Sequence, residues 1–87
     1  MISSTFCRVC GYDFGVVVWG ESDETPMHGY ICPCCGAQVG LEDINYRGVQ
    51  LYRTAWLENG AKWFQPRERP EDWDLFEQLK SIPDRFR

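Results

Sequence analysis

Four cysteines of this 87-residue chain stand in two pairs of the form Cys-x2-Cys-Gly. The pairs are Cys7-Arg8-Val9-Cys10-Gly11 and Cys32-Pro33-Cys34-Cys35-Gly36, so the pattern recurs at an offset of 25 residues. Two intervening residues allow both sulfurs of a turn to face one centre, and the glycine can take positive φ there. Two such turns supply the four thiolates of a tetrahedral zinc site. The sequence therefore predicts one structural metal ion held by Cys7, Cys10, Cys32 and Cys35.

Two other interpretations of these cysteines stay open, namely buried reduced thiols and a disulfide framework. The first five residues, Met1 to Thr5, lack both the charged start and the apolar core of a secretion signal. We therefore expect a cytoplasmic protein, in which paired cysteines more commonly bind a metal than form disulfides. Zinc is the expected ion and iron the alternative, because four thiolates can hold either. The metal is expected to contribute directly to folding.

A fifth cysteine and the single histidine lie close to the predicted site. Cys34 falls inside the second turn, too near Cys32 for the usual ligand spacing, so we expect a spare thiol. A redox or nucleophilic role for Cys34 is the alternative. His28 precedes Cys32 by four residues and is expected in an exposed loop, with a role as a fifth or substitute ligand as the alternative.

The two Cys-x2-Cys-Gly turns resemble the knuckles of zinc ribbons and of rubredoxin, over residues 6–40. The wider chain resembles a set of small, uncharacterised bacterial cysteine-rich proteins with a CPCC box. Besides that box, the residues that carry the resemblance are Tyr52-x3-Trp56-Leu57-x2-Gly60-Ala61-Lys62-Trp63-Phe64, Pro70-x2-Trp73 and Gln78-Leu79-x2-Ile82-Pro83. The resemblance implies a zinc-ribbon-like start with a helical tail, and it implies no established activity.

The elements expected in residues 1–45 form a small β-hairpin. The β-branched, apolar run from Phe14 to Trp19 ends at Gly20 and predicts a strand. Residues 20–29 are acidic, contain Pro26 and are expected to form a loop. Residues 29–31 would then lead back as a second short strand into the second cysteine turn. This half is therefore predicted to be a zinc-ribbon-like β-hairpin with two rubredoxin-type knuckles.

Residues 46–87 are expected to be helical and to pack on the ribbon. Val49, Tyr52 and Trp56 form one stripe of an amphipathic helix, which Asn59-Gly60 would end. A second helix is expected to begin at Pro70 and to end before Pro83, with an apolar line of Leu75, Leu79 and Ile82. The predicted fold class is small α+β, with two packed α-helices after the ribbon and a single domain over residues 1–87.

Trp63 lies beyond the stop signal of the first predicted helix. We expect it to fill the gap between the helices, because a tryptophan carries a large apolar area. A partner-binding anchor beside Lys62 is the alternative.

Charge is distributed unevenly along the chain. Residues 1–45 carry Arg8 against six acidic side chains, a net charge of −5, and residues 46–87 carry eight basic and seven acidic side chains, for a total of −4. Four thiolates around a divalent ion would add about −2 to the first half. This balance disfavours nucleic acid as a partner and favours a basic protein. No apolar run reaches the roughly 18–20 residues of a membrane-spanning helix.

The sequence offers little from which to build an enzyme. A zinc ion with four cysteine ligands has no open position, and neither a glycine-rich phosphate loop nor a serine motif with a histidine base is present. The expected function is therefore that of a non-enzymatic, zinc-stabilised protein-binding module. A cytoplasmic immunity or antitoxin-like protein for a basic partner would fit. A rubredoxin-like iron electron carrier and a nucleic-acid-binding zinc ribbon are the alternatives.

Overall fold

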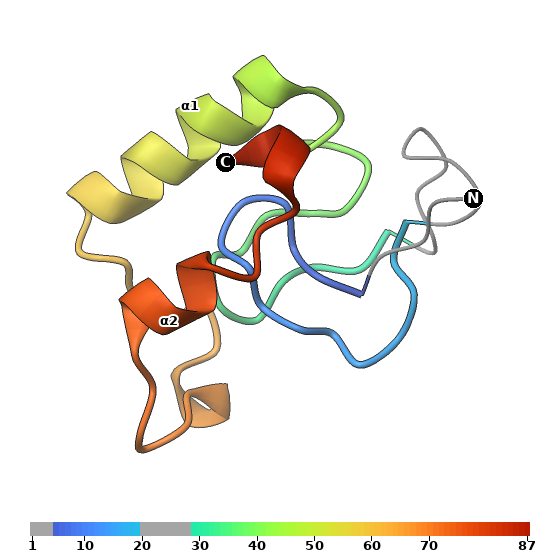
Figure 1. Cartoon of the computed structure of the whole chain (residues 1–87). Helices are drawn as coiled ribbons and strands as arrows, with labels where there is room; N and C mark the ends of the chain where they lie inside the picture. Colours follow the sequence, from blue (N-terminus) through green and yellow to red (C-terminus); the bar gives the residue numbers. More distant parts are fainter. Residues whose placement is uncertain (1–4, 20–28) are drawn as a thin grey trace.

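The computed structural model describes residues 5–19 and 29–87 (Figure 1). Four helical segments follow one another along the chain: α1 (Tyr46–Glu58), the 3-10 helix η1 (Pro66–Glu68), α2 (Leu75–Leu79) and the 3-10 helix η2 (Asp84–Phe86). The two cysteine-containing loops lie in the middle of the molecule, with α1 along one side and η2 beside it (Figure 1). Most of the predicted acidic loop lies outside the described residues.

The described part of the first half contains no β-strand, so the predicted zinc-ribbon hairpin with rubredoxin-type knuckles is wrong. Pairing there is limited to isolated antiparallel bridges, such as those of Phe6 with Asp13 and of Ile31 with Gln38. The small α+β fold class is therefore wrong as well. Helices and irregular segments surround two closed cysteine turns instead.

Glycine conformations explain why the predicted strands do not form. Gly15 has φ of 76°, and its N–H donates to Oδ1 of Asp13 at 2.9 Å, which turns the chain where the first strand should begin. Val16 and Val17 follow and remain largely exposed instead of pairing. Gly29 has φ of 58° and breaks the second predicted strand in the same way.

Helix α1 confirms the helix predicted from its apolar stripe. Asn45 caps its N-terminus, because its side chain accepts the N–H of Gly48 at 2.8 Å. Val49 and Trp56 are buried, while Gly60, at φ of 93°, reverses the chain at the predicted stop. Local sequence signals therefore fix both ends of this helix.

Helix α2 is shorter than predicted and does not pack against α1. It begins after Asp74, whose carboxylate accepts the N–H groups of Phe76 and Glu77, and not at Pro70. α1 packs on η2, so the prediction of two packed α-helices is wrong. α2 lies over the first cysteine turn instead, where the carbonyl of Gln78 comes within 2.2 Å of the place that a Cβ on Gly11 would take.

The core combines the cysteine turns with apolar side chains of the second half. Its buried members are Cys7, Val9, Cys10, Cys32, Cys34, Cys35, Ala37, Val49, Trp56, Ala61, Trp63, Ile82 and Phe86. Trp63 is 7% exposed and packs edge-on against Tyr12 and Trp73, with centroid distances of 5.8 and 5.5 Å. It is a core residue and does not project as an exposed anchor.

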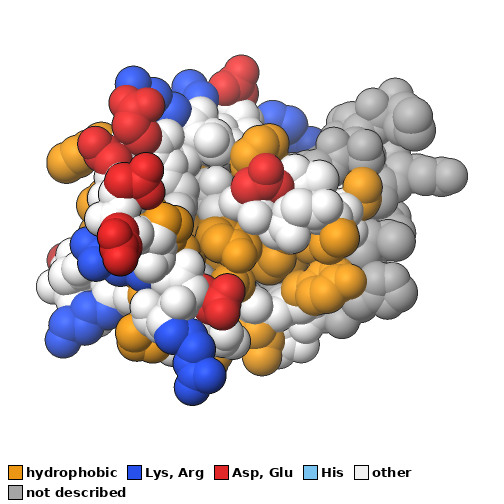
Figure 2. Space-filling model, turned by 90° about the horizontal axis from the view of Figure 1, so that it is seen from below, with side chains coloured by type: hydrophobic (Ala, Val, Ile, Leu, Met, Phe, Trp, Pro, Cys, Tyr) orange, Lys and Arg blue, Asp and Glu red, His pale blue; other side chains and the backbone are white. Residues whose placement is uncertain are grey.

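Hydrophobic side chains also reach the surface. They gather in the middle of the face seen in Figure 2, with charged side chains at one side. None of the helices in the described ranges has the length and apolar character needed to cross a membrane.

Candidate metal centre

The first and second cysteine turns, residues 6–15 and 31–40, repeat one another's backbone structure. Matching N–H groups donate to matching carbonyls: Cys7 to Tyr12 at 2.8 Å and Cys32 to Ala37 at 2.9 Å, then Gly11 to Cys7 and Gly36 to Cys32, both at 2.9 Å. Gly11 has φ of 84° and Gly36 of 83°, which confirms the predicted role of the glycine after each second cysteine. The offset of 25 residues is therefore a repeat of structure as well as of sequence.

The four predicted cysteines meet between the two turns. Their Sγ atoms all lie within 4.8 Å of one another, and all four side chains are buried. The Sγ atoms of Cys7 and Cys35 are 3.7 Å apart, and those of Cys10 and Cys32 are 3.6 Å apart. A tetrahedral shell with metal–sulfur bonds of about 2.3 Å has edges of about 3.8 Å. The four-cysteine cluster thus has the size that a single metal ion requires.

The thiols of the cluster influence one another's ionisation strongly. Burial raises the pKa of Cys10, whereas hydrogen bonds with Cys10, Cys35 and Cys7 lower the pKa of Cys32. The contact with Cys10 lowers the pKa of Cys35, but the contacts with Cys32 and Cys7 and burial raise it overall. Four thiols this close cannot all lose their protons in an apolar interior without a compensating cation. A divalent ion would supply that charge and displace the protons.

Arg53, on the buried side of α1, links the helix to the first cysteine turn and to η2. Its Nε donates to the carbonyl of Val9 at 2.6 Å, and its Nη2 donates to the carbonyls of Arg8, at 2.7 Å, and Phe86. Burial lowers the pKa of Arg53, while the nearby thiolates, Cys7 first, raise it. The guanidinium therefore brings positive charge near the cluster. Sequence reasoning missed this residue, although its spacing places it on the stripe of Val49 and Trp56.

Arg8, inside the first cysteine turn, is also buried. Its guanidinium carbon lies 3.4 Å from the ring centroid of Trp19 and 4.2 Å from that of Phe86, and Nη1 donates to the carbonyl of Asp43 at 3.1 Å. Burial lowers the pKa of Arg8 to about 10 and raises that of Asp43 to about 6. Oδ1 of Asp43 accepts the N–H of Gly40 at 2.7 Å. Arg8 and Asp43 thus tie the two cysteine turns together.

Cys34 is buried but lies outside the group of four. Nε2 of Gln78 donates to Sγ of Cys34 at 3.3 Å and to the carbonyl of Cys10 at 3.1 Å. The hydrogen bond with Cys10 lowers the pKa of Cys34. Oε1 of Gln78 accepts the indole N–H of Trp73 at 2.8 Å, so the side chain of Gln78 links α2 and Trp73 to Cys10 and Cys34. His28 lies outside the described residues.

A surface hollow of about 300 Å³ reaches the edge of the cluster at Cys35, between Tyr52 and Trp56. Cys35 is 6% exposed, more than the other three cysteines of the cluster. The hydroxyl of Tyr52 donates to the carbonyl of Cys35 at 3.2 Å, which fixes the second turn against α1. Chelators and small reagents should therefore reach the cluster from the Cys35 side.

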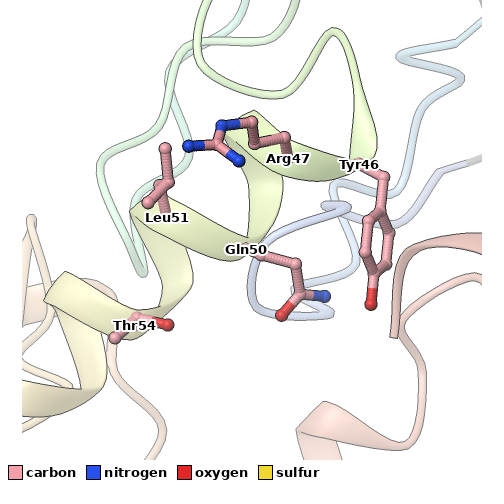
Figure 3. Close-up of a pocket in the computed structure, with 5 residues that line it drawn as sticks. All are labelled: Tyr46, Arg47, Gln50, Leu51 and Thr54. Carbon is pink, nitrogen blue, oxygen red and sulfur yellow. The ribbon is translucent and has the colours of Figure 1, made fainter.

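Another hollow, of about 330 Å³, lies on α1 and is lined by Tyr46, Arg47, Gln50, Leu51 and Thr54. Its side chains diverge, with Arg47 and Leu51 pointing away from Gln50 and Tyr46 (Figure 3). The amide of Gln50 and the hydroxyl of Tyr46 already donate to the carbonyl of Arg87, at 3.0 and 3.3 Å. This hollow therefore lacks the convergent polar groups of a catalytic or ligand-binding site.

Comparison with known proteins finds relatives of this chain in one bacterium. No family model and no solved structure matches the chain. The uncharacterised protein YozI of Bacillus subtilis (strain 168) is 30% identical, over 76% of this chain and 67% of the relative. The uncharacterised protein YoaQ of the same strain is 34% identical, over 76% of this chain and 68% of the relative.

Proposed function

Because this chain belongs to the family of the uncharacterised Bacillus subtilis proteins YozI and YoaQ, whose names give no activity, we propose a function from its four-cysteine cluster. The cluster holds one structural zinc ion, and the ion stabilises a small, non-enzymatic protein-binding module. The observation that carries this proposal is the meeting of four buried Sγ atoms within 4.8 Å of one another.

The sulfur–sulfur distances favour a single ion over a cluster of metals. The closest pairs, at 3.6 and 3.7 Å, match the edges of a tetrahedron around one ion. Each of these pairs joins one cysteine turn to the other. An ion at the centre would therefore crosslink residues 6–15 to residues 31–40, which no strand pairing does in the described part of the chain.

The four cysteine ligands favour a structural role for the ion over a catalytic one. Four thiolates complete the shell of a zinc ion, so no position remains for water or substrate. The polar side chains beside the cluster are already engaged: Arg53 donates to the carbonyl of Val9, Tyr52 to that of Cys35, and Gln78 to that of Cys10 and to Sγ of Cys34. Without a catalytic position, a small metal-stabilised domain can still act by binding another protein.

Iron is the alternative ion, because a four-thiolate shell accepts it and would give a rubredoxin-like electron carrier. The nucleic-acid alternative assumed a zinc ribbon, which residues 5–19 and 29–87 do not form. The basic partner stays a prediction from the charge of residues 1–45. Three of the acidic residues behind it, Glu21, Asp23 and Glu24, lie outside the described residues, and Asp43 is buried.

Elemental analysis of the purified full chain tests the identity of the metal. The protein is produced without added metal, and the metal-to-protein ratio is measured by mass spectrometry. We expect one zinc per chain and a colourless solution. A coloured, iron-containing protein would support the electron carrier, and a folded protein without stoichiometric metal would refute the proposal.

Cysteine variants test the ligand set. Cys7→Ser and Cys35→Ser should lose the metal and most of the folded structure, because zinc contributes an apparent ~10–16 kcal/mol in zinc-binding peptides. Cys34→Ser is the matched control, since this buried thiol lies beside the cluster but outside it, and it should retain the metal. Metal content and circular dichroism are measured on the same samples. Loss of metal from Cys34→Ser with retention in Cys35→Ser would show that the ligands are assigned wrongly.

A further inference from the structure

A hollow of about 420 Å³ lies beyond the end of α1, remote in sequence from the cysteine turns. Its lining residues are Gly60, Ala61, Lys62, Trp63, Pro66, Arg69 and Trp73. We call it the Trp63 groove. Its volume falls within the range of about 300–1,000 Å³ that is typical of ligand sites. It contains most of the Ala61–Phe64 motif, whose last residue donates its N–H to the carbonyl of Cys34 at 2.9 Å.

The two tryptophans form a fixed aromatic wall in this groove. Their rings meet edge to face, with centroids 5.5 Å apart and an interplanar angle of 83°. The indole N–H of Trp73 is held by Gln78, at 2.8 Å. The indole nitrogen of Trp63 is buried and finds no hydrogen-bond partner among the described residues. Trp63 is 7% exposed and Trp73 is half-buried, so the exposed parts of the two rings offer an apolar surface to a side chain of another molecule.

Two cations accompany the aromatic wall. The guanidinium carbon of Arg69 lies 5.3 Å from the ring centroid of Trp73, so stacking orients the group while its N–H edge can still bind a carboxylate. Lys62 is exposed beside it in the lining. No carboxylate in residues 5–19 or 29–87 forms an ion pair with either side chain. Both cations are therefore available to an acidic group.

The floor of the groove is held in an uncommon conformation. Ala61 has φ of 51°, the one positive value among the non-glycine residues described. Its N–H donates to the carbonyl of Trp56 at 2.9 Å, and the indole N–H of Trp56 donates to the carbonyl of Lys62 at 2.9 Å. Backbone strain of this kind persists where surrounding contacts enforce it, and it is frequent at binding sites.

We propose that the Trp63 groove binds an acidic segment of a partner protein. An aromatic, apolar or proline side chain of the segment packs on Trp63 and Trp73, and a neighbouring Asp or Glu carboxylate contacts Arg69 and Lys62. A peptide fits better than a small molecule, because Gly60, Lys62, Pro66 and Arg69 are all exposed and leave the groove open.

This inference rests on the proposed function as a protein-binding module and specifies the chemistry of the bound segment. The local charge of the groove is opposite to the charge of residues 1–45, from which a basic partner was predicted. The partner must therefore present an acidic segment at this site, whatever its charge elsewhere.

Selection from a display library of random dodecapeptides, with the metal-loaded full chain as the target, tests the inference. We expect enrichment of Asp or Glu next to an aromatic residue or proline. The binding of a selected, labelled peptide is then measured by fluorescence anisotropy. Arg69→Glu should weaken binding about tenfold or more, and added salt should weaken it further. Arg67→Glu is the matched control, because Arg67 is exposed in the same segment and does not line the groove.

Several outcomes would overturn the inference. These are the absence of any enriched peptide, enrichment of Lys or Arg, and equal weakening by Arg67→Glu and Arg69→Glu. A dimer in sedimentation experiments that Arg69→Glu dissociates would assign the groove to a second copy of the chain and would also refute an acidic partner segment. Metal content and circular dichroism of the same samples separate the two proposals. A folded, metal-loaded protein that selects no acidic peptide refutes the groove alone, whereas a folded protein without metal refutes the metal centre.

Discussion

Replacing Arg53 by methionine should strongly destabilise the protein. Methionine retains much of the apolar length of the side chain but cannot donate to the carbonyls of Val9, Arg8 and Phe86. These bonds join α1 to the first cysteine turn and to the C-terminal segment, and Arg53 is only 8% exposed. The variant therefore removes the Arg53 donor from the carbonyls of Arg8 and Val9, leaves the carbonyl of Phe86 with Gln50 as its donor, and removes a cation near the thiolates.

The expected cost follows from these contacts. A hydrogen bond with a charged partner contributes about 1.5–3 kcal/mol, and an unsatisfied buried group costs about 1–3 kcal/mol. Because two of the three bonds share Nη2, the contributions do not add fully, and we expect a total loss of about 3–6 kcal/mol. A chain of this length typically has a free energy of unfolding of about 4–13 kcal/mol. Arg53→Met should therefore lose a large fraction of its free energy of unfolding.

Urea unfolding, followed by circular dichroism at a fixed concentration of free zinc, measures this loss. Arg47→Met is the matched control, because Arg47 lies on the exposed side of the same helix, and it should change the free energy of unfolding by less than about 0.5 kcal/mol. Amide exchange at Phe86 should also accelerate in Arg53→Met, since η2 loses one of its hydrogen bonds to α1 and keeps those from Gln50. A loss below about 1 kcal/mol, or one equal to that of Arg47→Met, would refute the reasoning.

Three further changes test other contacts. Gly11→Ala should cost at least about 2 kcal/mol more than Gly15→Ala in urea unfolding, because both glycines have positive φ but only a Cβ on Gly11 would meet the Gln78 carbonyl, at 2.2 Å. Gln78→Ala should weaken zinc binding about tenfold in a competition with a chromogenic chelator, because it frees the carbonyl of Cys10 and lets α2 move; unchanged affinity would contradict this role. Burial raises the pKa of Asp43 from 3.8 to about 6, so the folded protein binds this proton more tightly than the unfolded chain. The free energy of unfolding should thus fall as pH rises from about 4 to about 6, by up to about 3 kcal/mol, and above pH 6 this contribution stays constant. Asp43→Asn should remove that slope from a series of urea titrations, and an unchanged slope would assign it to other groups.

The local features of the chain could be predicted well. The spacing of the cysteines and the glycine after each pair predicted two equivalent turns, because positive φ after the second cysteine is a property of a few adjacent residues. Asn59-Gly60 likewise marked the C-terminal end of α1, since capping depends on groups within one turn of the helix, whereas the N-cap Asn45 was not predicted. The assignment of the four cysteines as metal ligands stays a prediction until the metal is measured.

The apolar run at Phe14–Trp19 predicted a strand that the structure does not contain. A β-branched run forms a strand only if another segment offers a partner over its length, and the turn at Gly15 interrupts this run, which forms a bridge at Trp19 and no continuous strand. In the same way, the apolar line of the last predicted helix did not reveal that α2 begins only after Asp74. It also did not reveal that η2, and not α2, packs on α1.

The sequence by itself thus determined the two turns, the helix α1 and the set of cysteines that could share an ion. Tertiary structure alone decided that Arg8 and Arg53 are buried and that Trp63 and Trp73 form a groove with two cations. The physical reason is the range of the interactions. Turn geometry and helix caps depend on neighbours in the chain, whereas the burial of a charge depends on carbonyls and rings supplied by residues more than thirty positions away.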